Sequence, residues 1–122
     1  MDFQLRPETP EDTPLLFEIF SHTHGAHLRA FPDPLLRMQF EAQRAHYRAT
    51  YPAADFLIIT RGSHPAGRLC VNRTSGAIHL IDIALLPACQ GQGLGKAVLE
   101  SLLIPGHTVT LSVQLGNPAR RL

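Results

Sequence analysis

A glycine-rich segment between a predicted strand and a predicted helix places the strongest constraint on this chain. Ile78 to Leu85 is largely apolar, as in a buried strand, and Leu94 to Leu103 has helical apolar spacing. The turn between them, Pro87 to Gly95, contains Gly91, Gly93 and Gly95. Glycines let backbone N–H groups converge, and the first turn of a helix leaves its own N–H groups unsatisfied. The segment is therefore predicted to cradle an anion such as phosphate.

Two common phosphate loops do not match this segment. A Walker loop would need a glycine where the chain has Gln90 and a hydroxyl where it has Ala97. A dinucleotide-binding fingerprint would need its third glycine at the position of Lys96. An ordinary glycine-rich connection without a ligand stays open as an alternative.

A third type of phosphate loop fits the residues. The pattern Gln or Arg, two residues, Gly, one residue, Gly or Ala is satisfied by Gln90, Gly93 and Gly95, and the apolar run from Ile81 to Pro87 precedes it. This combination resembles the acyl-CoA loop of the GCN5-related N-acetyltransferase (GNAT) family. The resemblance covers essentially all of the chain. It implies an α/β fold of the acyl-CoA N-acyltransferase type, a mixed sheet with about five strands and three helices whose C-terminal strands are missing.

The composition bounds the class of protein. With 122 residues, 44% of them hydrophobic, and a formal net charge of +1, the chain is expected to form one domain, residues 1–122. No basic stripe predicts nucleic-acid binding, and no stretch approaches the ~20 apolar residues of a membrane span. We therefore expect a cytoplasmic protein with no nucleic-acid or membrane partner. Cys70 and Cys89 are expected to be free thiols.

Local patterns predict the other elements. Thr9, Pro10 and Asp12 form a capped helix start, and the helix is predicted to run to about Ser21. A second helix is predicted from Asp33 to just before Pro52. The predicted strands, besides the one before the loop, are Phe3 to Arg6, Phe56 to Thr60, Gly67 to Val71 and Val109 to Leu115, with a turn at Gly62 to Pro65.

The chain departs from the family at its C-terminal end. Asn117 to Leu122 looks like the start of the family's last helix, and the tyrosine that relatives offer as general acid would fall just after Leu122. No residue of this sequence therefore corresponds to that tyrosine. Without the following strands, Leu111 and Val113 would face solvent unless covered, so a homodimer with possible strand exchange is predicted.

The resemblance also implies a donor site. Acetyl-CoA would be the acyl donor, with its pyrophosphate bound by Gln90, Gly91, Gln92, Gly93, Leu94, Gly95 and Lys96. The main chain of Ile83, Ala84 and Leu85 would pair with the pantetheine arm, and the Leu85 N–H would polarise the thioester carbonyl. Asn117 would bind the same arm, although a helix N-cap before Pro118 explains it equally well.

Two residues are candidates for the catalytic base. Relatives often have Glu or His at the position of His79, eleven residues before Gln90, and an imidazole takes up protons near neutral pH. A histidine with only a packing role is the alternative. Asp82 ranks second. It is predicted on the opposite face of the strand, where a carboxylate needs a buried partner and so has a structural role.

Other polar clusters are weaker candidates. His22, His24 and His27 lack zinc-motif spacing, so no metal is expected. Arg37, Arg44 and Arg48 attract an anionic acceptor or form a solvated helix face. The function implied by the resemblance is transfer of acetyl from acetyl-CoA to a primary amine of an unidentified small molecule, peptide or protein. The alternative is a non-catalytic acyl-CoA-binding or interaction module.

Overall fold

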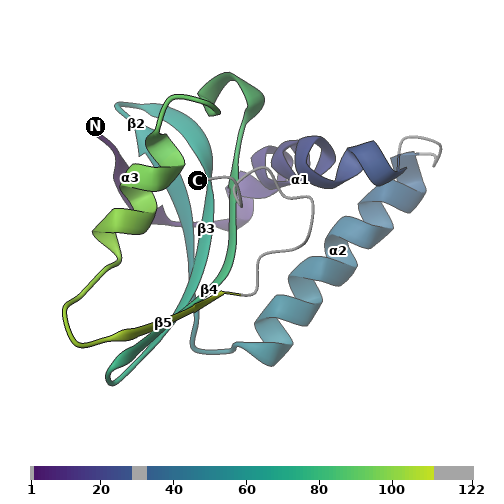
Figure 1. Ribbon diagram of the computed structural model, residues 1–122. Helices are drawn as coiled ribbons and strands as arrows, with labels where there is room; N and C mark the ends of the chain where they lie inside the picture. Colours follow the sequence, from purple (N-terminus) through teal and green to yellow (C-terminus); the bar gives the residue numbers. More distant parts are fainter. Residues whose placement is uncertain (1, 29–32, 112–122) are drawn as a thin grey trace.

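The computed structural model describes residues 2–28 and 33–111, and residues 24–28 are described by their backbone alone. A twisted sheet runs through the middle of the molecule, helices α1 and α2 cover one face, and helix α3 covers the other (Figure 1). The elements in chain order are β1 (Gln4–Pro7), the 3-10 turn η1 (Pro10–Asp12), α1 (Thr13–Leu28), α2 (Asp33–Thr50), β2 (Asp55–Arg61), β3 (His64–Thr74), β4 (Ala77–Leu85), the 3-10 turn η2 (Pro87–Cys89), α3 (Leu94–Ser101) and β5 (Thr108–Leu111).

The described sheet has the order β1-β2-β3-β4-β5. The first four strands pair antiparallel, whereas β4 and β5 are parallel and are joined through α3. A parallel pair needs such a crossover, because its strands cannot be joined by a tight hairpin. The predicted mixed α/β fold with five strands and three helices is therefore confirmed.

Several predicted boundaries were wrong. Helix α1 continues to Leu28 instead of ending near Ser21, because the polar residues that follow tolerate helix and no proline interrupts them. Strand β3 begins at His64, so the turn predicted for Gly62 to Pro65 is shorter. The strand accepts Pro65 because the register with β2 shifts between Ile59 and Thr60, beside the proline. Helix α3 stops at Ser101, two residues before Leu103.

The core lies on both faces of the sheet. Between the sheet and α3, the buried apolar residues include Ile59, Leu69, Leu80, Ile83, Leu94 and Val98. On the opposite face, one cluster joins α1, α2 and β2 through Leu16, Phe20, Phe40 and Ile58. A second cluster joins the end of α2 to β3 and β4 through Tyr47, Cys70 and Ile81. Strand β4 is thus buried on both sides, which is why its sequence shows no clean alternation.

The start of η1 is held by a charge-assisted network. The guanidinium of Arg6 donates to both carboxylate oxygens of Asp12, with Nη1 to Oδ2 at 2.9 Å and Nη2 to Oδ1 at 2.8 Å. The backbone N–H of Thr9 also donates to Asp12 Oδ2, at 2.8 Å. These hydrogen bonds, with that of Arg6 the largest cause, lower the pKa of Asp12 from its ordinary 3.8 to about 2. The predicted capping role of Thr9 and Asp12 is confirmed.

We expect Asp12→Asn to make the free energy of unfolding less dependent on pH in acid. Because the pKa of Asp12 is lower in the folded protein, its contribution to stability is complete above about pH 4 and is lost as the pH falls towards about 2. Urea unfolding of both proteins between these pH values measures the effect. The wild-type advantage should shrink as the pH falls, and an advantage constant across this range would contradict the assignment.

The apolar edge at β5 is exposed as predicted for Leu111, whose relative exposure is 65%. Val109 on the same strand is 40% exposed. Val113 and Asn117 lie outside the described residues. In the described part of the chain, none of the helices combines the length and apolar character needed to cross a bilayer.

Candidate functional site

The loop between β4 and α3 depends on glycine at two positions. Gly91 has φ of 74° and Gly93 has φ of 82°, both in the left-handed region that side chains avoid. Gly93 is also the N-cap of α3, and it offers no side chain to that helix end. The backbone N–H groups in the first turn of α3 therefore have no side-chain acceptor at the N-cap and can donate to an outside group.

The glutamine side chains of the loop turn back onto the protein. Gln90 Nε2 donates to the Leu85 carbonyl at 3.0 Å, and Gln92 Nε2 donates to the Ala88 carbonyl at 2.9 Å. Gln92 Oε1 also accepts from Arg61 Nη1 at 3.0 Å. Strands β2 and β4 run in the same direction, which brings Arg61 and the loop to one end of the sheet. These bonds hold the loop against the end of the sheet and turn both glutamine side chains away from its main chain.

This loop fits a phosphate. A Cβ placed on Gly91 would have no heavy atom within 4 Å, so the backbone there is open to an approaching group. Lys96 lies in the first turn of α3 with a side chain that is 70% exposed, at 4.0 Å from Glu100. No carboxylate occurs between Gln90 and Lys96. Unsatisfied amides, one cation and no like charge are what a phosphate requires.

At the end of β4 the backbone N–H of Leu85 points away from β3. A Cβ on Gly67 would lie only 2.2 Å from the Ala84 carbonyl oxygen, so that carbonyl points at β3 and only glycine fits opposite it. In a trans peptide the N–H opposes the C=O, so the Leu85 N–H points to the other edge. Leu86 N–H donates to the Ala66 carbonyl at 2.8 Å, which agrees with this alternation.

On that other edge the described part of β5 reaches only a short way. Its residues Thr108–Leu111 pair with Ala77–Leu80, and the pairing ends at Leu80 and Leu111. Strand β5 is therefore described only beside the first half of β4.

A β-bulge changes the expected position of Asp82. Cys70 pairs with Asp82 and Val71 pairs with Leu80, so Ile81 is an extra residue in β4. An extra residue reverses the alternation of side chains along a strand. Asp82 therefore points to the α1–α2 face, the same face as His79. The prediction that the two side chains lie on opposite faces was wrong.

Asp82 has the buried partner that a carboxylate in an apolar strand needs. Arg68 Nε lies 3.5 Å from Asp82 Oδ2, and the side chains are 5% and 7% exposed. Arg68 Nη2 donates to Cys70 Sγ at 2.9 Å, and the guanidinium lies 5.8 Å from the centre of the Tyr47 ring. Asp82 is thus part of a buried ion pair beneath helix α2.

The electrostatics of this cluster follow from its burial. Burial raises the pKa of the Cys70 thiol to about 11 and raises that of the Tyr47 phenol. Burial works against the charge of Arg68, but Cys70 and Asp82 raise its pKa overall, so the guanidinium stays protonated. Cys70 and Tyr47 are therefore neutral at physiological pH. The expectation of free thiols is confirmed for both Cys70 and Cys89.

His79 lies at the junction of three elements. Its Nε2 is 3.4 Å from the hydroxyl of Tyr51, which follows α2, and its Nδ1 is 2.5 Å from Thr110 Oγ1 on β5. The Tyr51 and His79 rings stack with centres 5.6 Å apart. The side chain is partly buried, so His79 is positioned by defined contacts.

The arginine row on α2 packs on aromatic rings. Arg37 lies 4.1 Å from the centre of the Phe17 ring, Arg44 lies 5.4 Å from that of Phe40, and Arg48 lies 4.4 Å from that of Phe56. Arg44 also donates to Thr13 Oγ1, and Arg48 pairs with Glu8. These contacts tie α2 to its neighbours, so the row is more than a solvated face.

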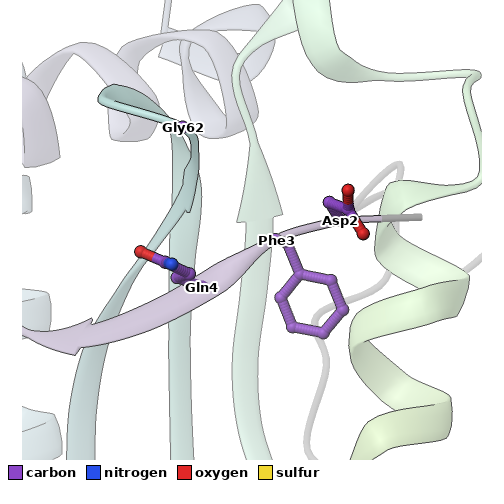
Figure 2. Close-up of a pocket in the computed structure, with 4 residues that line it drawn as sticks. All are labelled: Asp2, Phe3, Gln4 and Gly62. Carbon is purple, nitrogen blue, oxygen red and sulfur yellow. The ribbon is translucent and has the colours of Figure 1, made fainter.

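Other predicted or visible features lie away from the loop. His22 is exposed, while the side chains of His24 and His27 lie outside the described residues. Within the described ranges, no three metal-ligating side chains gather closely enough to hold an ion. An open hollow of about 480 Å³ is lined by Asp2, Phe3, Gln4 and Gly62, and the Phe3 ring points towards α3 (Figure 2). The hollow contains none of the predicted site residues.

Comparison with known families decides the classification. Residues 15–119 match the acetyltransferase (GNAT) family, which is most of the chain. The chain belongs to the GNAT family. An acetyltransferase of Thermus thermophilus is 23% identical, with a TM-score of 0.59, and the match covers 88% of this chain and 72% of that one.

Other GNAT structures have the same fold. The PaiA N-acetyltransferase of Thermoplasma acidophilum, solved with coenzyme A, is 15% identical, with a TM-score of 0.54, over 83% of this chain and 69% of that one. A GNAT acetyltransferase of Desulfovibrio desulfuricans is 24% identical, with a TM-score of 0.54. The match covers 83% of this chain, which spans only 63% of the length of that protein.

The structure brings together most of the GNAT site residues predicted from sequence. Gln90 to Lys96 lie at the end of the β4 stretch Ile83 to Leu85, and His79 and Asp82 lie along the same strand. Asn117 lies outside the described residues. Sequence reasoning missed four polar residues that support the site: Tyr51, Arg61, Arg68 and Thr110. Only Arg68 gave a signal, as a cation within the otherwise apolar run Gly67 to Val71.

Proposed function

We propose that this GNAT protein binds acetyl-CoA and transfers the acetyl group to a primary amine of a small molecule, peptide or protein. The observation that carries the proposal is the loop from Gln90 to Lys96, whose main chain is presented outward by side chains that bond inward. The end of β4 supports it, because the Leu85 N–H points away from β3 and the strand leads through η2 into this loop. The GNAT relatives solved with coenzyme A and with acetyl-CoA add support for the donor.

Each part of the donor has a matching group. The amides from Gly91 to Lys96, with the Lys96 ammonium, would hold the diphosphate. The outward backbone of Ile83 to Leu85 would pair with the amides of the pantetheine arm. The Leu85 N–H would then donate to the thioester carbonyl and stabilise the oxyanion that forms during attack.

The reaction that follows is a direct transfer. The amine nitrogen forms a bond to the acetyl carbon, and the carbon–sulfur bond breaks as the tetrahedral intermediate collapses. The amine loses a proton, which His79 would accept directly or through water. A thiol pKa near ~8.5 lets the CoA sulfur leave as thiolate and take its proton from solvent. Asp82 would act through structure, because its carboxylate is buried beside Arg68.

We expect His79→Gln to lower kcat by about 10²-fold, since the amide keeps hydrogen-bonding groups but cannot take up a proton. The Kd for CoA should stay within about twofold, because the loop is unchanged. Steady-state rates and calorimetric titrations of both proteins check these values. Equal rates in the two proteins would place the base elsewhere.

Thiol release from acetyl-CoA with a panel of polyamines, amino acids, antibiotic amines and peptide N-termini tests the function itself. Release that depends on one class of amine supports the enzyme and identifies its acceptor. Tight CoA binding without release across the panel would instead support the non-catalytic module. The ribosomal-protein-S18-alanine N-acetyltransferase of Escherichia coli, which is 22% identical, makes peptide N-termini a useful arm.

The proposal extends to assembly and location. The exposed Val109 and Leu111 give β5 an apolar surface, and a second copy that covers it would form a homodimer. We place the protein in the cytoplasm, where acetyl-CoA is available. Sedimentation of the purified chain over a range of concentrations checks the dimer.

A further inference from the structure

Two hydroxyl groups and one imidazole form a continuous chain of contacts near the start of β4. Tyr51 comes from the segment after α2, His79 from β4 and Thr110 from β5. The Tyr51 oxygen is 3.4 Å from His79 Nε2, and Thr110 Oγ1 is 2.5 Å from His79 Nδ1. Both ring nitrogens therefore have a protein partner, and each partner comes from a different element.

The chemistry of the two hydroxyls assigns the direction of these bonds. A neutral imidazole carries a proton on one nitrogen and a lone pair on the other. A phenol is more acidic than an aliphatic hydroxyl, so it is the better donor and the poorer acceptor. The favoured arrangement has Tyr51 O–H donating to His79 Nε2 and His79 Nδ1–H donating to Thr110. In it, Nε2 is the basic nitrogen.

The two distances also indicate that Nε2 is the nitrogen that accepts the proton. The Thr110 contact is the closer of the two, whereas the Tyr51 contact is at the long end of the hydrogen-bond range. Nε2 can therefore exchange its weak partner for a proton from substrate at little cost. The stacked Tyr51 ring keeps the imidazole in the same plane as that exchange occurs.

The position of the group fits this use. His79 and Thr110 are direct partners in the parallel ladder, one step before its last described pair, Leu80 and Leu111. The second half of β4, Ile81 to Leu85, begins immediately afterwards. The group therefore lies next to the stretch of β4 along which the donor arm is proposed to bind.

We propose that Tyr51 and Thr110 are positioning residues that hold His79 in the Nδ1–H tautomer, with Nε2 as the proton acceptor for the incoming amine. This inference rests on the proposed function for its catalytic part. The tautomer itself is a property of the protein without substrate, so it can be measured separately.

Long-range ¹H–¹⁵N correlation spectra of the labelled full chain, at about pH 9 where histidine side chains in general are neutral, read the tautomer directly. The chain has seven histidines, and the signals of His79 are identified as those that disappear in His79→Gln. We expect a protonated Nδ1 and a bare Nε2 at His79. A protonated Nε2 in the wild type would overturn the inference.

Three variants test the two positioning residues. Thr110→Val removes the acceptor for Nδ1–H at constant shape and should give a mixture of tautomers, while Thr110→Ser should restore the single form. Tyr51→Phe keeps the ring stack and should shift only the Nε2 resonance. Unchanged His79 spectra in both Thr110→Val and Tyr51→Phe would overturn the inference.

The kinetic readout separates positioning from simple stability. Thr110→Val should lower kcat by about 5- to 10-fold, the effect of one hydrogen bond, with KM for acetyl-CoA unchanged. Tyr51→Phe removes only the weak partner that Nε2 gives up during the reaction, so it should change kcat by less than about twofold. Thr110→Ser should recover the rate. A rise in KM without a fall in kcat would overturn the catalytic part. If the tautomer is as expected but no amine is acetylated, the proposed function fails while the assignment of His79 stands.

Discussion

Replacing Arg68 by methionine is expected to lower the free energy of unfolding by about 3–5 kcal/mol, the cost of breaking a buried ion pair from one side. Arg68 and Asp82 lie 3.5 Å apart, and each side chain is less than a tenth exposed. Methionine fills a similar volume, so the loss reflects the Asp82 side chain left buried without this counter-charge. Urea unfolding at neutral pH measures the difference.

The double variant Arg68→Met, Asp82→Leu is the matched control. Removing both charges also removes the desolvation cost of the pair, and such replacements are often neutral or stabilising. We therefore expect the double variant to recover most of the stability that the single variant loses. If Arg68→Met alone cost less than about 1 kcal/mol, the pair would be no stronger than an exposed one and the account of this cluster would be wrong.

Gly93→Glu is expected to weaken CoA binding by more than about 100-fold, since it adds a negative charge at the N-cap of α3, where a phosphate would lie. Gly93 has φ of 82°, so any side chain also strains the loop. Both effects act on the same few amides. Calorimetric titration of CoA into wild type and variant measures the change.

Gly76→Glu is the control variant, which separates the effect of a charge in the loop from the effect of backbone strain alone. Gly76 has φ of 83°, nearly that of Gly93, but it lies in the turn between β3 and β4, at the end of β4 away from the loop. We expect this variant to lose a similar amount of stability and to bind CoA as the wild type does. CoA binding that survives Gly93→Glu, or fails equally in Gly76→Glu, would rule out the loop as the specific site.

The order of elements could be predicted from the sequence because local chemistry determines it. Proline and capping residues placed the starts at Pro10 and Asp33, and the glycines at 91 and 93 occupy the left-handed positions that the loop needs. The features of the candidate site that depend on this local chemistry, the loop and the strand before it, lie where the sequence placed them.

What the sequence did not reveal depends on contacts between distant segments. The bulge at Ile81 exists only through the register of β4 with β3, so the face of Asp82 could not be read from alternation. The pairing of Arg61 with Gln92 requires β2 and β4 to end at the same side of the sheet. Tyr51 and Thr110 meet His79 for the same reason, since three separate elements converge there.

A titration of CoA followed by backbone amide resonances tests the central claim most directly. The account predicts saturable shifts at Gly91, Gly93 and Gly95 and along Ile83 to Leu85, where the main chain would meet the diphosphate and the pantetheine arm. Gly76 and Gly106 lie in other turns and should stay unchanged. Shifts confined to those turns, or no saturable shift in the loop at millimolar CoA, would contradict the account.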